Sequence, residues 1–389
     1  MRWRKMFNEI PIANLKVGMK FSESLYFDEG NNIFVPANTP ISEKDMEVLQ
    51  QWKIKNVFSK TTDFSTENND NINSTIQNSK NNVVSVKSEK IKETYNELVS
   101  ELHKIFEKLK QRQVIQDKPV SKIIEKLTES AEKDPCLFVE LILNSDIENY
   151  KMAKAAINTA ILSYIIAKHL ELFESEIEDI VTAAILHDIG MLRVNDDIIQ
   201  KNKALTDMEM QTVEAHTNYG FKCAVSELMY TEAVGKIIMQ HHEHWDGTGY
   251  PGKLTAKQIT LGARILAVAD SFVAMTSPKA YRDAMLGYDA MKNLLNDNGE
   301  HFDPEVIKAT IQSLGIFPIG SIVLLNNTAI CMVIKNEPKT PLRPNLQVII
   351  DEHGQEFENQ TGELIDLSIQ KNLFILRAIN PKEYKKISI

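Results

Sequence analysis

The feature that most constrains this chain is a group of histidines and aspartates between His187 and Asp270. Five of the nine histidines fall in this interval, and the group closes with the string His-His-Glu-His-Trp-Asp-Gly-Thr-Gly-Tyr-Pro from His241 to Pro251. Imidazole and carboxylate together suit Fe, Mn, Zn or Ni. Two such ions bridged by one aspartate can activate water for attack on phosphorus. The pattern predicts a metal-dependent hydrolase site; the alternative is a buried polar network.

Helical periodicity places both aspartates of this group on core-facing sides of their helices. Asp188 continues one apolar stripe, with His187 at its edge, and Asp270 lies on another. An unpaired carboxylate on an apolar face would be costly, so both aspartates are expected to face cations. The first stripe is Ile177, Ile180, Val181, Ala184 and Ile185, and the second is Ala263, Leu266, Ala267, Val273 and Ala274.

The remaining histidines are expected at helix ends. Thr206 and Glu209 form a capping-box pattern that begins the helix leading to His216. His241 and His242 end a further helix. Because adjacent residues point about a third of a turn apart, this pair suits two ligands at one metal cluster.

A turn-rich loop follows the histidine pair directly. Gly247 and Gly249 allow the backbone to approach a ligand closely, and Tyr250 and Pro251 follow them. Taken alone, Gly-Tyr-Pro indicates only a loop.

In order and spacing, these residues resemble HD-GYP domains over roughly residues 145 to 315. The resemblance implies an all-helical, metal-dependent phosphodiesterase that hydrolyses cyclic di-GMP to linear pGpG, and further to GMP. Asp188 would bridge two ions and, with His187, form the catalytic centre. The implied metal ligands are His187, Asp188 and Asp270 at the first ion, and Asp188, His216, His241 and His242 at the second.

The resemblance also implies residues that hold the substrate. Tyr250 and Gly249 would line the pocket. Lys279 and Arg282 fall where the family places cations that hold the ligand phosphates. Without the family, a solvated loop is the preferred interpretation of these two cations.

The chain departs from the family at three positions. Lys151 and Ala155 replace a glutamate and a histidine, so the third metal site is predicted to be lost and the first ion lacks one protein ligand, a place that water or Asn158 could take. Met191 replaces a lysine. We therefore expect two divalent ions, with Fe or Mn favoured.

These departures leave two alternatives to hydrolysis of cyclic di-GMP. One is a degenerate HD-GYP protein that binds the nucleotide, or a protein partner at its Gly-Tyr-Pro surface, without hydrolysis. The other is a mononuclear phosphohydrolase that acts on other nucleotides, for which the Gly-Tyr-Pro string is unfavourable.

Composition narrows the class of protein further. The chain is 43% hydrophobic, with a net charge of −9 and no long basic run, which argues against binding a nucleic acid polymer. No apolar run is long enough to span a membrane and no signal region is visible, which predicts a cytoplasmic protein without membrane insertion. The cysteines are odd in number and widely spaced, so we expect reduced thiols; they are Cys136, Cys223 and Cys331.

The predicted fold class is mainly α, with an all-helical HD-type core between a small N-terminal β-rich module and a small C-terminal β-rich tail. An apolar seam between residues 88 and 110 allows either a homodimer or packing on its own domain. The expected divisions are a β-rich module at 1–60, a flexible polar linker at 61–87, a helical connector at 88–144, the metal-dependent core at 145–315 and a β-rich extension at 316–389.

Overall fold

The computed structural model divides the chain into two units, Met1–Val86 and Lys87–Ile389. Helices dominate the second unit, and antiparallel sheets occur in both. The predicted class, a mainly α protein with a helical core and β-rich ends, is confirmed. The described residues are 8–23, 25–26, 33–35, 41, 46, 56–59, 64–65, 70–144, 150–199, 201, 203–278, 284–357 and 362–380.

Short antiparallel strands build the first unit. Cross-strand apolar pairs hold its small core: Ile10 faces Val57 and Leu25 faces Val35, and all four side chains are buried. The four-stranded sheet has the order β1 (Asn8–Pro11), β5 (Asn56–Ser59), β3 (Leu25–Tyr26), β4 (Ile33–Val35); β2 (Lys20–Phe21) pairs with β6 (Phe64–Ser65), and the 3-10 turn η1 (Ile12–Asn14) follows β1.

A long helix, α2 (Asp70–Lys110), occupies most of the stretch predicted to be a linker. The prediction of a flexible linker at 61–87 is therefore wrong from Asp70 onward. Helix propagation is cooperative, so a segment anchored by packing can extend into a polar sequence at little cost. The predicted apolar seam packs against the helical core of its own domain; its buried members are Tyr95, Leu98, Leu102 and Phe106, with Val99 beside them.

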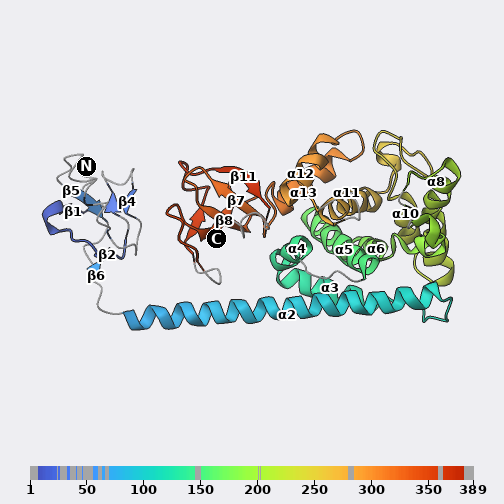
Figure 1. Cartoon of the computed structure of the whole chain (residues 1–389), viewed down its shortest axis with the longest axis horizontal. Helices are drawn as coiled ribbons and strands as arrows, with labels where there is room; N and C mark the ends of the chain where they lie inside the picture. The colour runs from blue at the N-terminus through green and yellow to red at the C-terminus, as the bar shows by residue number, and fades with distance from the viewer. Residues whose placement is uncertain are drawn as a thin grey trace, which may run out of the picture. The chain divides into compact units, whose positions relative to one another are not determined.

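Helices form the core of the second unit. α5 packs against α6 and α11, and α6 also packs against α10, as Figure 1 shows. Within the described ranges, no helix combines the length and the apolar character needed to cross a membrane. The elements after α2 are α3 (Ser121–Lys133), α4 (Pro135–Asn144), α5 (Lys151–His169), α6 (Glu174–Leu186), η2 (Ile189–Arg193), α7 (Asp196–Ile199), α8 (Asp207–Glu214), α9 (His216–Lys222), η3 (Cys223–Glu227), α10 (Glu232–Gln240), η4 (Ala256–Gln258), α11 (Leu261–Thr276), α12 (Gly287–Asn296) and α13 (Pro304–Leu314).

The segment that leads to His216 shows one confirmed prediction and one correction. Thr206 and Glu209 cap α8 reciprocally: the Glu209 carboxylate accepts from Thr206 N at 2.7 Å, and Thr206 Oγ1 accepts from Glu209 N at 3.4 Å. The helix does not run unbroken to His216, because it ends at Glu214 and α9 begins at His216. His216 Nδ1 lies 2.6 Å from the Val213 carbonyl oxygen. A side chain therefore competes here with the backbone hydrogen bonds of the helix.

A five-stranded antiparallel sheet follows the helices. Its strands have the order β10 (Leu364–Asp366), β9 (Asn345–Ile350), β8 (Ile330–Lys335), β7 (Ile322–Leu325), β11 (Ile375–Ile379). Cys331 pairs with Val323 on one side and Val348 on the other, and all three are buried, so a continuous apolar row crosses the sheet. All three cysteines of the chain are free.

Candidate metal centre

The side chains predicted to be metal ligands come from four parts of the helical core. His187 and Asp188 lie between α6 and the turn η2, as the C-cap of α6 and the N-cap of η2. Asp270 lies within α11. The three remaining candidates are His216, the first residue of α9, and His241 and His242, which follow α10.

Close contact between η2 and α9 brings two of these segments together. A Cβ added at Gly190 would lie 1.9 Å from His216 O and 2.8 Å from Gly220 N. Only glycine fits such an approach of two backbones. As a result, Asp188 Oδ1 lies 3.5 Å from His216 Nε2.

Three of the histidines share one arrangement, in which ring Nδ1 lies 2.6–2.7 Å from the carbonyl oxygen three residues earlier. A neutral ring that donates its Nδ1–H in this way keeps the Nε2 lone pair for a metal. All three Nε2 atoms are buried and make no hydrogen bond to any described residue. Since a buried acceptor without a partner is costly, the donor set fits a divalent cation. These residues are His187, His216 and His241.

The spacing of the ligand atoms fits ions better than direct hydrogen bonds. His187 Nε2 lies 3.4 Å from Asp188 Oδ2 and 3.5 Å from Asp270 Oδ1. Two atoms that bind one tetrahedral ion at about 2.1 Å are about 3.4 Å apart. The two oxygens of Asp188 face different histidines, as a bridging carboxylate requires. Ligand atoms of Asp188, His216, His241 and His242 all lie within 4.8 Å of one another.

The electrostatic environment sets the protonation states that ligands need. Burial lowers the pKa of His242 to about 4 and holds the pKa of His241 well below its ordinary value. Burial opposes ionisation of Asp188, but His187 outweighs it, and the pKa of Asp188 is lowered. Burial likewise lowers the pKa of His187, but Asp188 and Asp270 outweigh it, and the net direction is upward. His187 would therefore release a proton on binding a cation.

The Gly-Tyr-Pro loop packs directly against one candidate ligand. Tyr250 N donates to His242 O at 3.0 Å, and the Tyr250 ring stacks on the His242 ring with centroids 4.8 Å apart. A Cβ on Gly249 would lie 2.4 Å from the same carbonyl oxygen, so glycine is needed for this contact. Lys279 and Arg282, predicted to hold phosphates, lie outside the described residues.

Glu243 is a positioning residue that the sequence did not reveal. Its side chain is 3% exposed, and its carboxylate accepts from Gly252 N at 2.5 Å and from Leu254 N at 2.9 Å. These charge-assisted bonds fix the far end of the Gly-Tyr-Pro loop. A glutamate between two histidines and a glycine-rich loop was the available signal.

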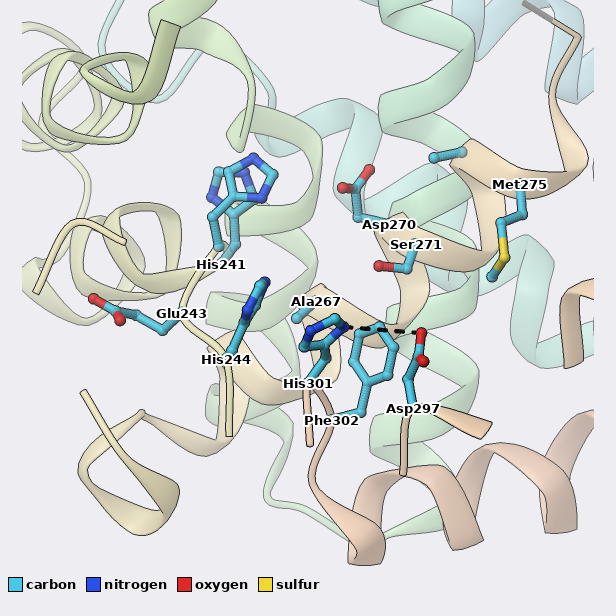
Figure 2. Close-up of a pocket in the computed structure, with 12 residues that line it drawn as sticks. His241, Glu243, His244, Ala267, Asp270, Ser271, Met275, Asp297, His301 and Phe302 are labelled. Atoms are coloured by element: carbon cyan, nitrogen blue, oxygen red, sulfur yellow. Dashed lines mark ion pairs between the residues drawn. The ribbon is translucent and has the colours of Figure 1, made fainter. Parts of the chain in front are cut away.

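A cavity of about 530 Å³ opens beside the candidate ligands. Figure 2 shows Asp270 and His241 at one end, with His301 and Asp297 beyond Ser271. His242 and His244 also line it. The cavity therefore joins the metal centre to a second group of polar side chains.

The positions that depart from the family lie on α5 and η2. Lys151, the first residue of α5, is exposed, and Ala155 is half-buried against the core. Met191 is half-buried in η2. Asn158, considered as a substitute ligand, is buried, and its amide oxygen accepts a hydrogen bond from Tyr95 at 2.7 Å. That bond occupies one of the two lone pairs of the oxygen.

Comparison with known proteins identifies the helical core and the C-terminal sheet. An HD domain matches residues 138–306, and a KOW domain associated with HD domains matches residues 322–387. A cyclic di-GMP phosphodiesterase of Pseudomonas aeruginosa is 30% identical over 245 residues, which are 63% of this chain and 58% of that protein.

Two further relatives differ in the share that they cover. A cyclic di-GMP phosphodiesterase of Borreliella burgdorferi is 23% identical over 381 residues, 98% of this chain and 97% of that protein. A 3'3'-cGAMP-specific phosphodiesterase of Vibrio cholerae is 32% identical over 142 residues, 36% of this chain and 27% of that protein. The HD-domain match, the histidine and aspartate cluster and the Gly-Tyr-Pro loop lead to one conclusion. Residues 138–306 of this chain form an HD domain, and the cluster and the loop agree with the resemblance to HD-GYP domains.

Proposed function

We propose that this chain is a metal-dependent phosphodiesterase that hydrolyses cyclic di-GMP to linear pGpG or onward to GMP. The observation that carries the proposal is the convergence of three buried Nε2 atoms and Asp188 beside a cavity of about 530 Å³. Ligand pockets of about 300–1,000 Å³ accept molecules of this class. Relatives named cyclic di-GMP phosphodiesterases support the choice of substrate.

The donor set suits two divalent ions, and a mixture of imidazole and carboxylate favours Fe or Mn. His216, His241 and His242 would hold one ion, and His187 and Asp270 the other, with Asp188 shared between them. When bound, such ions supply Lewis acidity toward a phosphodiester and lower the pKa of water. A third ion is not expected, because Lys151 and Ala155 offer no carboxylate or imidazole.

The chain's own residues would orient the substrate and hold its charge. Tyr250 stacks on His242, which lines the cavity. We propose that Lys279 and Arg282 offset the phosphate charge, since the chain as a whole is negative. Asp188, kept ionised by its neighbours, would be shared by the two ion sites and would fix their positions relative to each other.

Binding without hydrolysis is the less favoured alternative, because the relatives named above are phosphodiesterases. The lost pair on α5 motivates it, yet Asp188, His216, His241 and His242 still come together as a complete four-ligand group. A four-ligand group and a three-ligand group sharing Asp188 are sufficient for a bridged pair of ions.

The test is metal analysis of anaerobically purified protein alongside turnover of cyclic di-GMP. His216→Ala should lose metal and turnover. His353→Ala should lose neither, because His353 is 78% exposed in a turn after β9. Two metal ions with turnover would support the proposal. Binding of cyclic di-GMP without turnover by metal-loaded protein would instead favour the degenerate alternative.

A further inference from the structure

The cavity beside the metal centre has a second wall that takes no part in holding ions. His244 and His301 line it with their ring centroids 4.3 Å apart and their planes tilted by 36°. Asp297 lines it too, and its Oδ2 lies 3.9 Å from His301 Nδ1, too far for a hydrogen bond. In Figure 2 His301 and Asp297 lie away from His241, and His244 lies between His241 and His301.

Contacts from both sides hold this wall in place. Trp245 N donates to His301 O at 2.9 Å, and Asp246 N donates to Glu300 O at 2.9 Å. The loop after the histidine pair and the loop after α12 are therefore tied to each other. Asp297 O accepts from the amides of residues 300, 301 and 302, which fixes the turn that carries the Asp297 side chain. A preorganised wall lowers the entropy cost of binding.

The orientation of His244 can be read from its neighbours. Thr248 Oγ1 donates to Asp246 Oδ1 at 2.7 Å, since the carboxylate can only accept. The Thr248 oxygen, 2.9 Å from His244 Nδ1, must then accept from that nitrogen. In its neutral form His244 therefore carries its proton on Nδ1, and its ring is held rigidly as one face of the wall.

The charges around the cavity decide which part of a nucleotide this wall suits. Among the described residues that line it there is no lysine or arginine, and the carboxylates are Glu243, Asp270 and Asp297. Glu243 is engaged by the loop backbone, and Asp270 lies beside His187. Asp297 is therefore the carboxylate positioned to meet a ligand beyond the metal centre. It would repel a phosphate and attract hydrogen-bond donors.

We infer that His244, His301 and Asp297 form a guanine-base subsite, in which the Asp297 carboxylate accepts from N1–H and the N2 amino group while the base stacks on an outer face of the imidazole pair. The inference rests on the proposed function and deepens it. Guanine presents two adjacent donors to a carboxylate, whereas adenine presents an acceptor at N1, which the carboxylate would repel. Imidazole rings are suitable faces for an unstacked base. Asp297 is thus a specificity-determining residue.

The first arm of the test is equilibrium binding of GMP and AMP to the full metal-loaded chain. Asp297→Asn keeps the shape of the side chain and removes one acceptor, so the preference for GMP over AMP should fall about tenfold or more. Glu300→Gln is the matched control, because it makes the same chemical change at an exposed position of the same loop; its preference should equal that of the parent. The melting temperature checks that both variants are folded.

The second arm compares turnover of cyclic di-GMP with turnover of 3',3'-cyclic GMP-AMP, where the same variant should narrow the ratio of kcat/KM values. A parent without preference for GMP, or a preference that survives Asp297→Asn, overturns the inference. An equal loss of GMP and AMP binding also overturns it, because Asp297 would then contact the shared ribose. If the parent hydrolyses neither dinucleotide, the proposed phosphodiesterase function is contradicted, and the binding arm still decides the subsite.

Discussion

Gly190→Ala should damage the metal centre without altering a ligand. The added Cβ would lie 1.9 Å from His216 O, whereas carbon–oxygen contacts are normally at least about 3.3 Å. The turn η2 and helix α9 must therefore separate by about 1.4 Å. Metal–ligand distances tolerate only about 0.2 Å. Because Asp188 lies on one side of this contact and His216 on the other, the shared ligand group cannot be kept unchanged.

The expected magnitude follows from two opposing effects. Overpacking of a buried contact costs about 1–3 kcal/mol, and replacing glycine by alanine returns about 0.4–1 kcal/mol by restricting the unfolded chain. We expect metal-free Gly190→Ala protein to lose about 1–2 kcal/mol of stability. A misplaced supporting contact typically weakens metal binding about 10- to 100-fold, so affinity should fall more clearly than stability.

The assay is a competition titration with a chromogenic chelator, combined with urea unfolding of the metal-free protein. Gly220→Ala is the matched control on the same interface. Its Cβ would meet the Ile238 side-chain methyl at 2.8 Å, which can move more easily than a backbone carbonyl. A Gly190→Ala protein with the stability and metal affinity of the parent would refute the reasoning.

Three further predictions test the centre and its loop. Asp188→Ala should lose more metal than His187→Ala by elemental analysis, since Asp188 contacts both His187 and His216; equal retention would contradict a bridging role. The pKa of His242 falls from 6.5 to about 4 on folding, so the unfolded chain takes up the proton first as pH drops. Between these pH values, this group should lower the free energy of unfolding of the metal-free protein by about 3 kcal/mol. When the free energy of unfolding is measured with urea at several pH values, it should depend less steeply on pH in His242→Asn than in the parent. Glu243→Gln should cost about 1–3 kcal/mol and raise KM more than it lowers kcat, because the loop is loosened while the ligands stay; an unchanged KM would count against it.

The buried faces of the core helices were predicted from the local periodicity of apolar residues. The stripe from Ile177 to Ile185 is buried as expected, and it turns Asp188 toward the other candidate ligands. The capping box at Thr206 could be read from four residues. Such features depend on neighbours in sequence, so a single chain is enough to reveal them.

Features that depend on tertiary contact were missed. His301 packs on His244 although the two are far apart in the chain, and no periodicity links them. The helix breaks before His216 because the His216 ring hydrogen-bonds to a backbone carbonyl oxygen. This bond depends on the orientation of the ring, which the sequence does not give. The requirement for glycine at position 190 likewise depends on α9 lying against it. The N-terminal part of α2 was not predicted, because its polar composition, taken alone, favours a linker.

The contacts that hold the group around Asp188 do not include the positions on α5 that depart from the family. The group around Asp188 is held by the contact of Gly190 with His216, by stacking of Tyr250 on His242 and by Glu243 in the loop. None of these contacts involves α5, so substitutions at its start can remove an ion without disturbing the rest of the centre. Attack on a phosphodiester needs charge neutralisation and an activated water, which two bridged ions supply. If the third ion is lost, as we propose, we expect a different rate and the same class of reaction.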